Sequence, residues 1–241
     1  SLPVTFTDDN GVNIVTLHLK YGLEEEAFRY IKNASNEEIK KINSEEIFFN
    51  SIKYGSQRVA KLLLDSGSLK RSPAIDVRAY TIALKSERRM SMLYFLIKNN
   101  FDLKIAGNDK NFAQLLITSG DLNLLNFTLY YGFELEKYLA LPDQGELLFC
   151  AVDSESPDML EVLSRWGFSG NRKNQSGEIL SIYALRKFSN DMKNPQRGID
   201  MLREIIKLKD FDLKQKNIEG EAYSDAYKYL REYFINPNFF N

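Results

Sequence analysis

The stretch KLLLDSGSL, residues 61–69, sets three successive leucines before a polar pair and then Gly67. With Val59 upstream, the apolar residues fall at the spacing of an amphipathic helix. Glycine directly after such a run suits the left-handed backbone conformation in which many helices end, because it has no Cβ to strain the turn. The stretch therefore predicts a helix that ends at Gly67.

Four further stretches repeat this plan of an apolar helix followed by a turn residue. They are YFLIKNNFDL (94–103), NFTLYYGFEL (126–135), EVLSRWGFS (161–169) and EIIKLKDFDL (204–213). The turn residues Gly67, Asn100, Gly132, Gly167 and Asp210 are spaced by 33, 32, 35 and 43 positions. One step of 33 back from Gly67 reaches Ala34, directly after AFRYIKN. A period near 33 with one insertion indicates a repeat protein.

The apolar residues of these units align in columns. One column reads Val59, Met92, Leu124, Met159 and Leu202; the next reads Leu62, Phe95, Phe127, Val162 and Ile205; the third reads Leu63, Leu96, Thr128, Leu163 and Ile206. Columns at helical spacing predict that each helix turns one apolar face toward its neighbours.

A second, shorter helix is predicted upstream of each of these. HLKYG ends at Gly22, SIKYG at Gly55 and LLITSG at Gly120, and each glycine stands 12 residues before the end of the following helix. Two short antiparallel helices per unit follow, so the fold class is all-α.

The alternation of helix, glycine, helix and glycine at a period of 33 resembles the ankyrin repeat family, from about Asn13 to the C-terminus. LLLDSGS matches the family's Leu-Leu-x-x-Gly-Ala-Asp ending, whereas Phe101, Phe133 and Phe211 replace its small residue. The Thr-Pro-Leu-His opening of the family's first helix is missing, and ELLFCAV keeps only Ala151 at the matching place. Tetratricopeptide and other helical-hairpin repeats share the spacing, but the Gly-x-Asp-like endings favour ankyrin.

The resemblance implies a helical-hairpin solenoid, a curved stack forming a single domain over residues 1–241. Its approximate repeats are 1–34, 35–72, 73–105, 106–138, 139–172 and 173–214. Gly177-Glu178 and Gly220-Glu221 both lead into the first helix of a unit and are 43 residues apart, so the extra residues lie in the sixth repeat. They are FSNDMKNPQRG, 188–198, where Asn-Pro and Gly predict an exposed loop. Residues 215–241 carry one more helix, with polar residues for the outer face of a C-terminal cap.

Composition excludes several classes of protein. The 32 basic and 33 acidic residues nearly cancel, which argues against a dedicated nucleic-acid binder. No apolar run is long enough for a membrane helix, and no basic-then-apolar leader is present. We expect a soluble monomer, either cytoplasmic or delivered into a host cell. The sequence starts at Ser1, so a signal peptide removed earlier would not be visible.

Residues for catalysis or metal binding are few. His18 is the only histidine, and we expect it to make a hydrogen bond on or between helices. Cys150, the only cysteine, is expected in the core. Glu24–Glu26 fit the first turn of a helix, where negative charge is favourable. We expect no enzyme activity, no metal and no cofactor.

The candidate binding residues are aromatic and basic. Tyr131 and Trp166 stand directly before a turn glycine, where sister units carry Ser66, Asn99 and Lys209; they either form a binding surface or pack on the next hairpin. The ankyrin resemblance adds residues on hairpin tips and on the concave face of the first helices. These are Tyr54, Arg78, Lys110, Arg172 and Lys173. Tyr, Trp and Arg are also the residues that dominate interface hot spots.

These features predict a non-enzymatic module that binds a protein partner on its concave face. An adaptor, an inhibitor or the targeting arm of a bacterial effector would share them. The alternative is a recruiting or regulatory domain of a larger enzyme whose catalytic part lies outside this chain.

Overall fold

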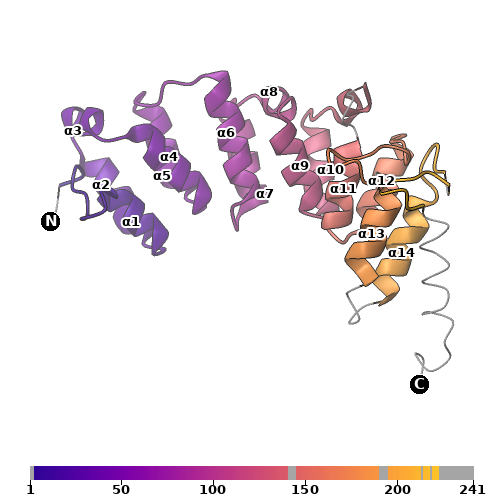
Figure 1. Ribbon diagram of the computed structural model, residues 1–241. Coiled ribbons are helices and arrows are strands. Elements are labelled where there is room, and N and C mark those ends of the chain that lie inside the picture. The colour runs from indigo at the N-terminus through magenta and orange to yellow at the C-terminus, as the bar shows by residue number, and fades with distance from the viewer. Residues whose placement is uncertain (1–2, 141–144, 190–194, 213, 218, 223–241) are drawn as a thin grey trace. The chain divides into compact units, whose positions relative to one another are not determined.

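The computed structural model describes residues 3–140, 145–189, 195–212, 214–217 and 219–222. Within these residues the fold is all-α, and the only β-type pairings are isolated bridges. The helices are α1 Ile14–Lys20, α2 Glu24–Asn33, α3 Asn36–Lys41, α4 Ser44–Lys53, α5 Gln57–Asp65, α6 Pro73–Leu84, α7 Arg89–Lys98, α8 Leu103–Gly107, α9 Lys110–Thr118, α10 Leu122–Tyr130, the 3₁₀ helix η1 Leu135–Ala140, α11 Gly145–Asp153, α12 Pro157–Arg165, α13 Leu180–Ser189 and α14 Pro195–Ile205 (Figure 1). The predicted cap helix after residue 222 lies outside the described residues.

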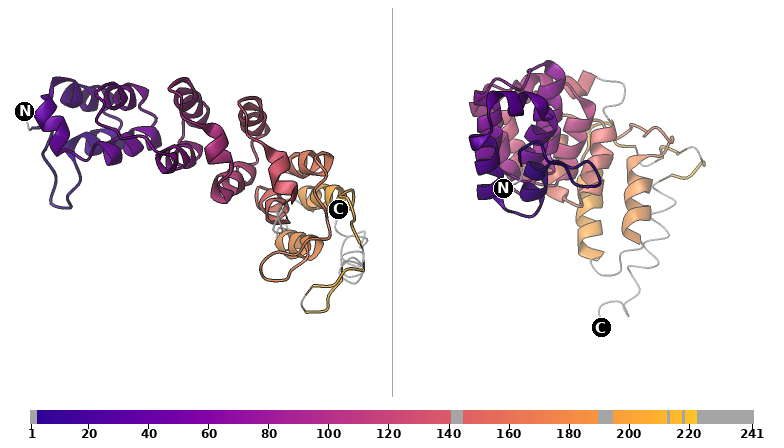
Figure 2. Two further views of the ribbon diagram at one scale, coloured as in Figure 1. Left: turned by 90° about the horizontal axis from the view of Figure 1, so that it is seen from above. Right: turned by 90° about the vertical axis from the view of Figure 1, so that its left-hand side faces the viewer.

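The chain divides into two compact units. The first runs to Phe112 and includes Tyr131–Phe133, and the second consists of Ala113–Tyr130 and the residues from Glu134 onward. In the first unit α1 packs on α2, α4 on α5 and α6 on α7, while α4 lies between α1 and α6 and α5 lies beside α2. The pairs succeed one another along the indigo to magenta part of Figures 1 and 2. In the second unit α11 packs on α12 and α13 on α14, with α12 beside α14 and α11 beside α13.

The helix ends follow the predicted plan. Gly67, Gly132, Gly167, Asn100 and Asp210 all have positive φ angles, from 58° to 101°, as the left-handed cap requires. Gly22, Gly55 and Gly120, at the ends of the upstream helices, share this conformation. Most of the helix starts are fixed by a side chain that accepts a backbone N–H. The capping residues are Asn13, Ser35, Asn43, Ser56, Ser72, Asp102, Asp109, Asp121 and Ser156.

A turn with one set of hydrogen bonds occurs three times, at Asp8–Gly11, Asn174–Gly177 and Asn217–Gly220. In each, the first residue's side-chain oxygen accepts two backbone N–H groups, two and four residues on, and the glycine N–H donates to its carbonyl. The glycines have φ angles of 75°, 75° and 82°. The Gly-Glu transitions at 177 and 220 are therefore the same local structure, and α13 begins shortly after the first of them.

Two of the three predicted columns lie in the core in the first four stretches, whereas the column of Leu62, Phe95, Phe127, Val162 and Ile205 is mixed: Phe95 and Ile205 are buried and the other three are half-buried. Val59, Met92, Leu124 and Met159 are fully buried, and so are Leu63, Leu96, Thr128 and Leu163. The replacements of the family's small residue also face inward: Phe101 and Phe133 are buried, and Phe211 packs against a cluster of Ile179, Ile182 and Leu185.

In the sixth predicted repeat, 173–214, the buried positions of α14 differ from those predicted. Met201 and Ile205 are fully buried there, whereas Ile206, predicted in the core, is 48% exposed. Gly198 lies against Phe188 of α13, where an added Cβ would stand 2.9 Å from the Phe188 Cβ. Since 201 and 205 follow 198 by three and seven residues, the face that Gly198 brings close to α13 also carries Met201 and Ile205. The prediction for Leu202 and Ile206 is wrong by one residue.

The prediction that 188–198 form an exposed loop is wrong at both ends of that range, where the residues belong to helices. Phe188 is a buried residue of α13, and Pro195 begins α14. Residues 190–194 lie outside the described residues. Three connections between successive helix pairs contain short helices that were not predicted from the sequence, namely α3, α8 and η1. Local capping explains two of them, because Ser35 and Glu38 form a reciprocal capping box and Asp102 accepts two N–H groups of α8.

Candidate binding surface on the first unit

A surface pocket of about 560 Å³ opens between α4 and α6 in the first unit. Its lining residues are Asn43, Glu45, Glu46, Phe49, Asn50, Lys53, Arg78 and Ile82. We refer to this pocket as the α4–α6 groove. It includes Arg78, one of the residues predicted from the sequence.

The sequence of α4 places its contribution on one face. Glu46, Phe49 or Asn50, and Lys53 follow each other at intervals of three or four residues, so their side chains line one side of the helix. The cap fixes the start of this face, because the Asn43 side chain accepts the N–H of Glu46 at 3.1 Å. Phe49 is buried and supplies an apolar floor between polar neighbours.

Arg78 projects from α6 and closes the groove on the other side. Its guanidinium lies over the ring of Phe49, 4.1 Å from the centroid, and Nη1 donates to Glu45 Oε1 at 3.1 Å. Both charged side chains are about half exposed. This pair, stacked on an aromatic ring, keeps guanidinium N–H groups available at the surface. The groove can therefore offer a partner a cation, carboxylates and amides around an apolar floor.

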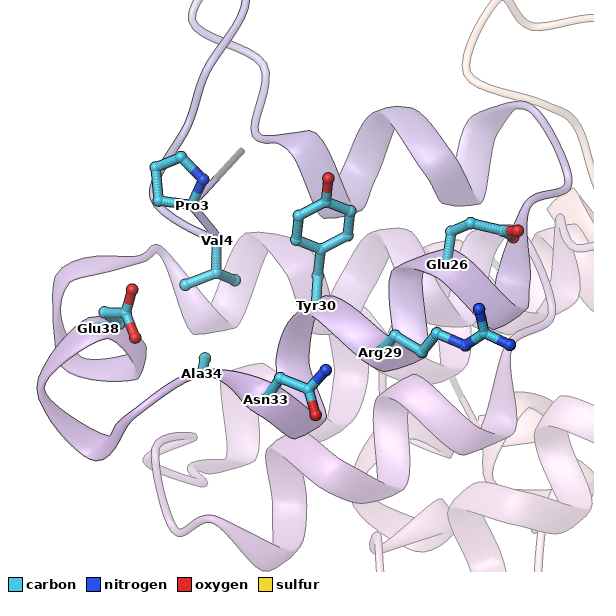
Figure 3. Close-up of a pocket in the computed structure, with 8 residues that line it drawn as sticks. All are labelled: Pro3, Val4, Glu26, Arg29, Tyr30, Asn33, Ala34 and Glu38. Carbon is cyan, nitrogen blue, oxygen red and sulfur yellow. The ribbon is translucent and has the colours of Figure 1, made fainter. Parts of the chain in front are cut away.

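A second pocket of about 440 Å³ lies beside α2 and the N-terminal segment (Figure 3). It is lined by Pro3, Val4, Glu26, Arg29, Tyr30, Asn33, Ala34 and Glu38. Several of its charges already have partners. The Glu38 carboxylate accepts hydrogen bonds from the N–H and hydroxyl of Ser35, both at 2.9 Å, which lowers the pKa of Glu38. Arg29 lies 3.4 Å from Glu25.

The residues considered for chemistry have local roles in the described structure. His18 Nδ1 lies 2.7 Å from the Ile14 carbonyl oxygen, and the ring lies against Tyr30, in agreement with the predicted helix-surface role. Glu24, Glu25 and Glu26 occupy the first turn of α2 as predicted. Cys150 is half-buried on α11, so its prediction as a core residue is wrong. Among the described residues no three His, Cys, Asp or Glu side chains converge as metal ligands do.

The other predicted binding residues are spread over both units. Tyr54 is the half-buried C-cap of α4, directly after Lys53 of the groove. Tyr131 is half-buried, and its ring meets that of Tyr94 edge to face with the centroids 6.4 Å apart. This contact agrees with the second of the two roles considered for Tyr131, packing on a neighbouring helix pair. Lys110 is the first residue of α9, the first helix of its predicted repeat.

In the second unit, Trp166 is the C-cap of α12 and is 38% exposed. Arg172 and Lys173 are exposed in the connection before α13, where the backbone of Lys173 forms a bridge with Ile179. These residues belong to a different unit from the α4–α6 groove, which contains only Arg78 of the predicted set.

Sequence reasoning missed most of the groove. The helical spacing of Glu45, Phe49 and Lys53 could have indicated that they share a face of α4 with Asn50. The sequence pattern does not indicate that α6 lies opposite this face. It also missed the exposed aromatics Tyr21, Tyr94 and Tyr130, which are 70%, 43% and 82% exposed.

Comparisons complete the description of the chain. In the part of the chain that the structure describes, no helix has the length and apolar character needed to cross a membrane. No family model, no curated protein and no solved structure matches this chain.

Proposed function

We propose that this chain is a non-enzymatic binding module built of ankyrin-like helical hairpins, and that a protein partner binds the face formed by its first helices. One observation supports the proposal above the others: side chains about 33 residues apart touch. Arg58 reaches Glu25, Arg78 reaches Glu45 and Lys187 reaches Asp153, at sequence separations of 33, 33 and 34. Contacts at the period of the sequence repeat are those expected when successive hairpins stack.

Stacked hairpins favour binding for a physical reason. The helices α1, α4 and α6 lie side by side, so their outer faces form a continuous surface before any partner arrives. A preformed surface loses little conformational entropy on binding. The α4–α6 groove adds an arginine held on an aromatic ring, a group that is frequent among residues contributing most to binding energy.

Site-specific photo-crosslinking tests the proposal. A photoreactive amino acid is placed at Asn50, in the groove, or at Lys61, an exposed residue of the second helix α5, and each protein is mixed with extract of its native cell. We expect a discrete crosslinked protein from position 50, and its loss when Arg78→Glu is added. The same product from position 61 with no effect of Arg78→Glu would reject the first-helix face. Catalytic turnover by the purified chain would reject the non-enzymatic function.

A further inference from the structure

Three lysines stand at matching positions along the ends of α1, α4 and α6. Lys20 and Lys53 are the last residues of α1 and α4, and Lys85 is the C-cap of α6. They are 33 and 32 residues apart in sequence, and all three are exposed. We call them the lysine row.

Contacts on either side hold the first two lysines level with each other. One turn before them, the Asn50 amide lies 3.4 Å from the Thr16 hydroxyl. Just after them, the Ser56 hydroxyl donates to Glu24 at 2.8 Å. The first contact joins α4 to α1 and the second joins the N-cap of α5 to the start of α2, so Lys20 and Lys53 end neighbouring helices at the same edge.

The third lysine is placed in the same way. Arg78 and Glu45 join α6 to α4 two turns before the lysines. Beyond the lysines, Arg88 lies so close to Gly55 that a Cβ there would be 2.7 Å from the Arg88 Cδ. The turns after α4 and α6 are therefore in contact, and Lys85 continues the line set by Lys20 and Lys53.

The lysine row carries charge that the described protein does not neutralise. None of the three lysines forms an ion pair with a described residue, whereas Arg58, Lys61, Arg71 and Arg78 of the same unit each do. The nearest carboxylate along the chain is the exposed Glu87, and the turn that holds it also holds exposed Arg88. Glu24, across the turn from Lys20, is engaged by Ser56.

Aromatic rings accompany two of the lysines. The Lys20 and Lys53 ammonium groups lie 5.7 and 5.2 Å from the ring centroids of Tyr21 and Tyr54. A lysine at a helix C-terminus is favoured by the helix dipole alone, but the dipole does not account for the tyrosine beside it, which is exposed at Tyr21 and half-buried at Tyr54. An ammonium held beside a ring keeps its N–H groups for a partner while the ring supplies flat apolar surface.

We propose that the lysine row binds an extended acidic segment of the protein partner, with carboxylates at every third residue. Helices in contact lie about 8–10 Å apart, which sets the spacing of the three ammonium groups. An extended segment in the polyproline II conformation has three residues per turn and advances about 3.1 Å per residue, so every third side chain points to the same side and three residues cover the same distance. A nucleic acid fits less well, because proteins that bind nucleic acids carry a strong basic excess, whereas this chain has 32 basic and 33 acidic residues. This inference rests on the proposed function and names the chemistry of the partner.

Fluorescence anisotropy with synthetic peptides tests it. The probes are a fluorescein-labelled peptide with three glutamates separated by pairs of serines, an isomer with the glutamates adjacent, and a single-stranded oligonucleotide. Binding is measured at low ionic strength, where screening is weakest. We expect the spaced peptide to bind more tightly than either of the other probes. Replacement of the row by Lys20→Gln, Lys53→Gln and Lys85→Gln should weaken that binding about tenfold, since three charge contacts are lost.

The chain offers a matched control. Lys32 and Lys98 end or nearly end the second helices α2 and α7, are exposed, and lie 5.7 and 5.2 Å from the rings of Phe28 and Tyr94. Lys32→Gln with Lys98→Gln should leave peptide affinity within about twofold of the original, because these lysines are outside the row. Circular dichroism of each variant confirms that it is folded.

Several outcomes would overturn the inference. They are absence of binding by the spaced peptide, equal losses in the row and control variants, and tighter binding of the adjacent-glutamate isomer or the oligonucleotide. The crosslinking test separates this failure from that of the proposed function. If position 50 still captures its partner in the lysine-row variant with unchanged yield, the binding module stands and the acidic segment is rejected.

Discussion

The guanidinium of Arg58 on α5 lies 2.6 Å from the carboxylate of Glu25 on α2, across 33 residues of sequence. The hydrogen bond and charge of Arg58 hold the pKa of Glu25 below its ordinary value of 4.5, with a smaller contribution from Arg29. Both side chains are about half exposed, so the contact marks where α5 packs beside α2 without contributing much to stability.

Replacing Arg58 by alanine should raise the pKa of Glu25 toward its ordinary value. A carboxylate with a depressed pKa in the folded state stabilises the protein above its unfolded pKa, and this contribution is lost as pH falls through the folded pKa. The original protein should therefore lose more stability than Arg58→Ala between neutral pH and a pH below 4.5. NMR titration of the Glu25 carboxyl carbon measures the pKa. Lys61→Ala, which removes an ion pair to Asp65 on the same helix, is the control and should leave that pKa unchanged.

Replacing Phe48 by alanine should destabilise the first unit by about 3–5 kcal/mol. Phe48 is fully buried and stacks on Phe101 with ring centroids 5.6 Å apart, so its removal leaves a cavity that the packed helices cannot readily fill. Tyr21→Ala is the control, because that side chain is 70% exposed and its loss should change stability by no more than about 0.5 kcal/mol. Amide hydrogen exchange of α4 during urea titration measures both. Equal effects would show that Phe48 is not a core residue.

Replacing Glu155 by glycine should stabilise the second unit by about 0.5–1 kcal/mol. Glu155 has a φ angle of 56° and stands 12 residues before Gly167, the place that glycine takes in three other units. A left-handed residue with a Cβ costs about 1–2 kcal/mol, and the change also removes the ion pairs of Glu155 with Arg197 and Lys187, which offsets part of the gain.

Gly67→Ala provides the opposite case. Its φ angle is 67° and no atom lies within 4 Å of the position of an added Cβ, so any cost comes from the backbone alone. We expect a loss of about 1–2 kcal/mol, measured by urea unfolding. A stabilised Gly67→Ala protein would contradict the assignment of a strained left-handed turn.

Trp166 and Tyr131 should respond differently to alanine substitution. Tyr131 meets Tyr94 edge to face and is half-buried, so Tyr131→Ala should lower the melting temperature through loss of packing worth about 0.5–1.5 kcal/mol. Trp166 is 38% exposed at the end of α12, and under the sequence-based hypothesis that it belongs to a binding surface its loss should weaken partner binding by about 2 kcal/mol with little change in melting temperature.

Lys61→Ala and Glu161→Ala are the controls for this pair. Both residues lie on second helices, and each forms an ion pair within its own helix with a residue four positions on, Asp65 for Lys61 and Arg165 for Glu161. Calorimetry of partner binding beside thermal unfolding separates the two effects. Partner affinity lost in the controls and retained in Trp166→Ala would place binding on the second-helix face.

Much of the fold could be predicted from local rules in the sequence. Helix ends at Gly67, Asn100 and Asp210 follow from which residues tolerate a left-handed backbone, and that preference acts within one turn of chain. The buried columns follow from helical periodicity, because any helix in a stack must turn its apolar side toward a neighbour. Of the groove, sequence reasoning reached Arg78 alone, through the family resemblance.

Only the tertiary structure decided which faces meet and how closely. In α14 the predicted Ile205 is buried, but Met201 is buried in place of Leu202, because Gly198 lets that helix approach Phe188, a contact between helices that no periodic pattern specifies. The α4–α6 groove and the lysine row likewise exist only because α4 packs beside α6 and α1. Periodicity fixes which side of a helix is apolar, but its rotation and depth against a neighbour depend on the volumes of both contacting surfaces, which lie far apart in the chain.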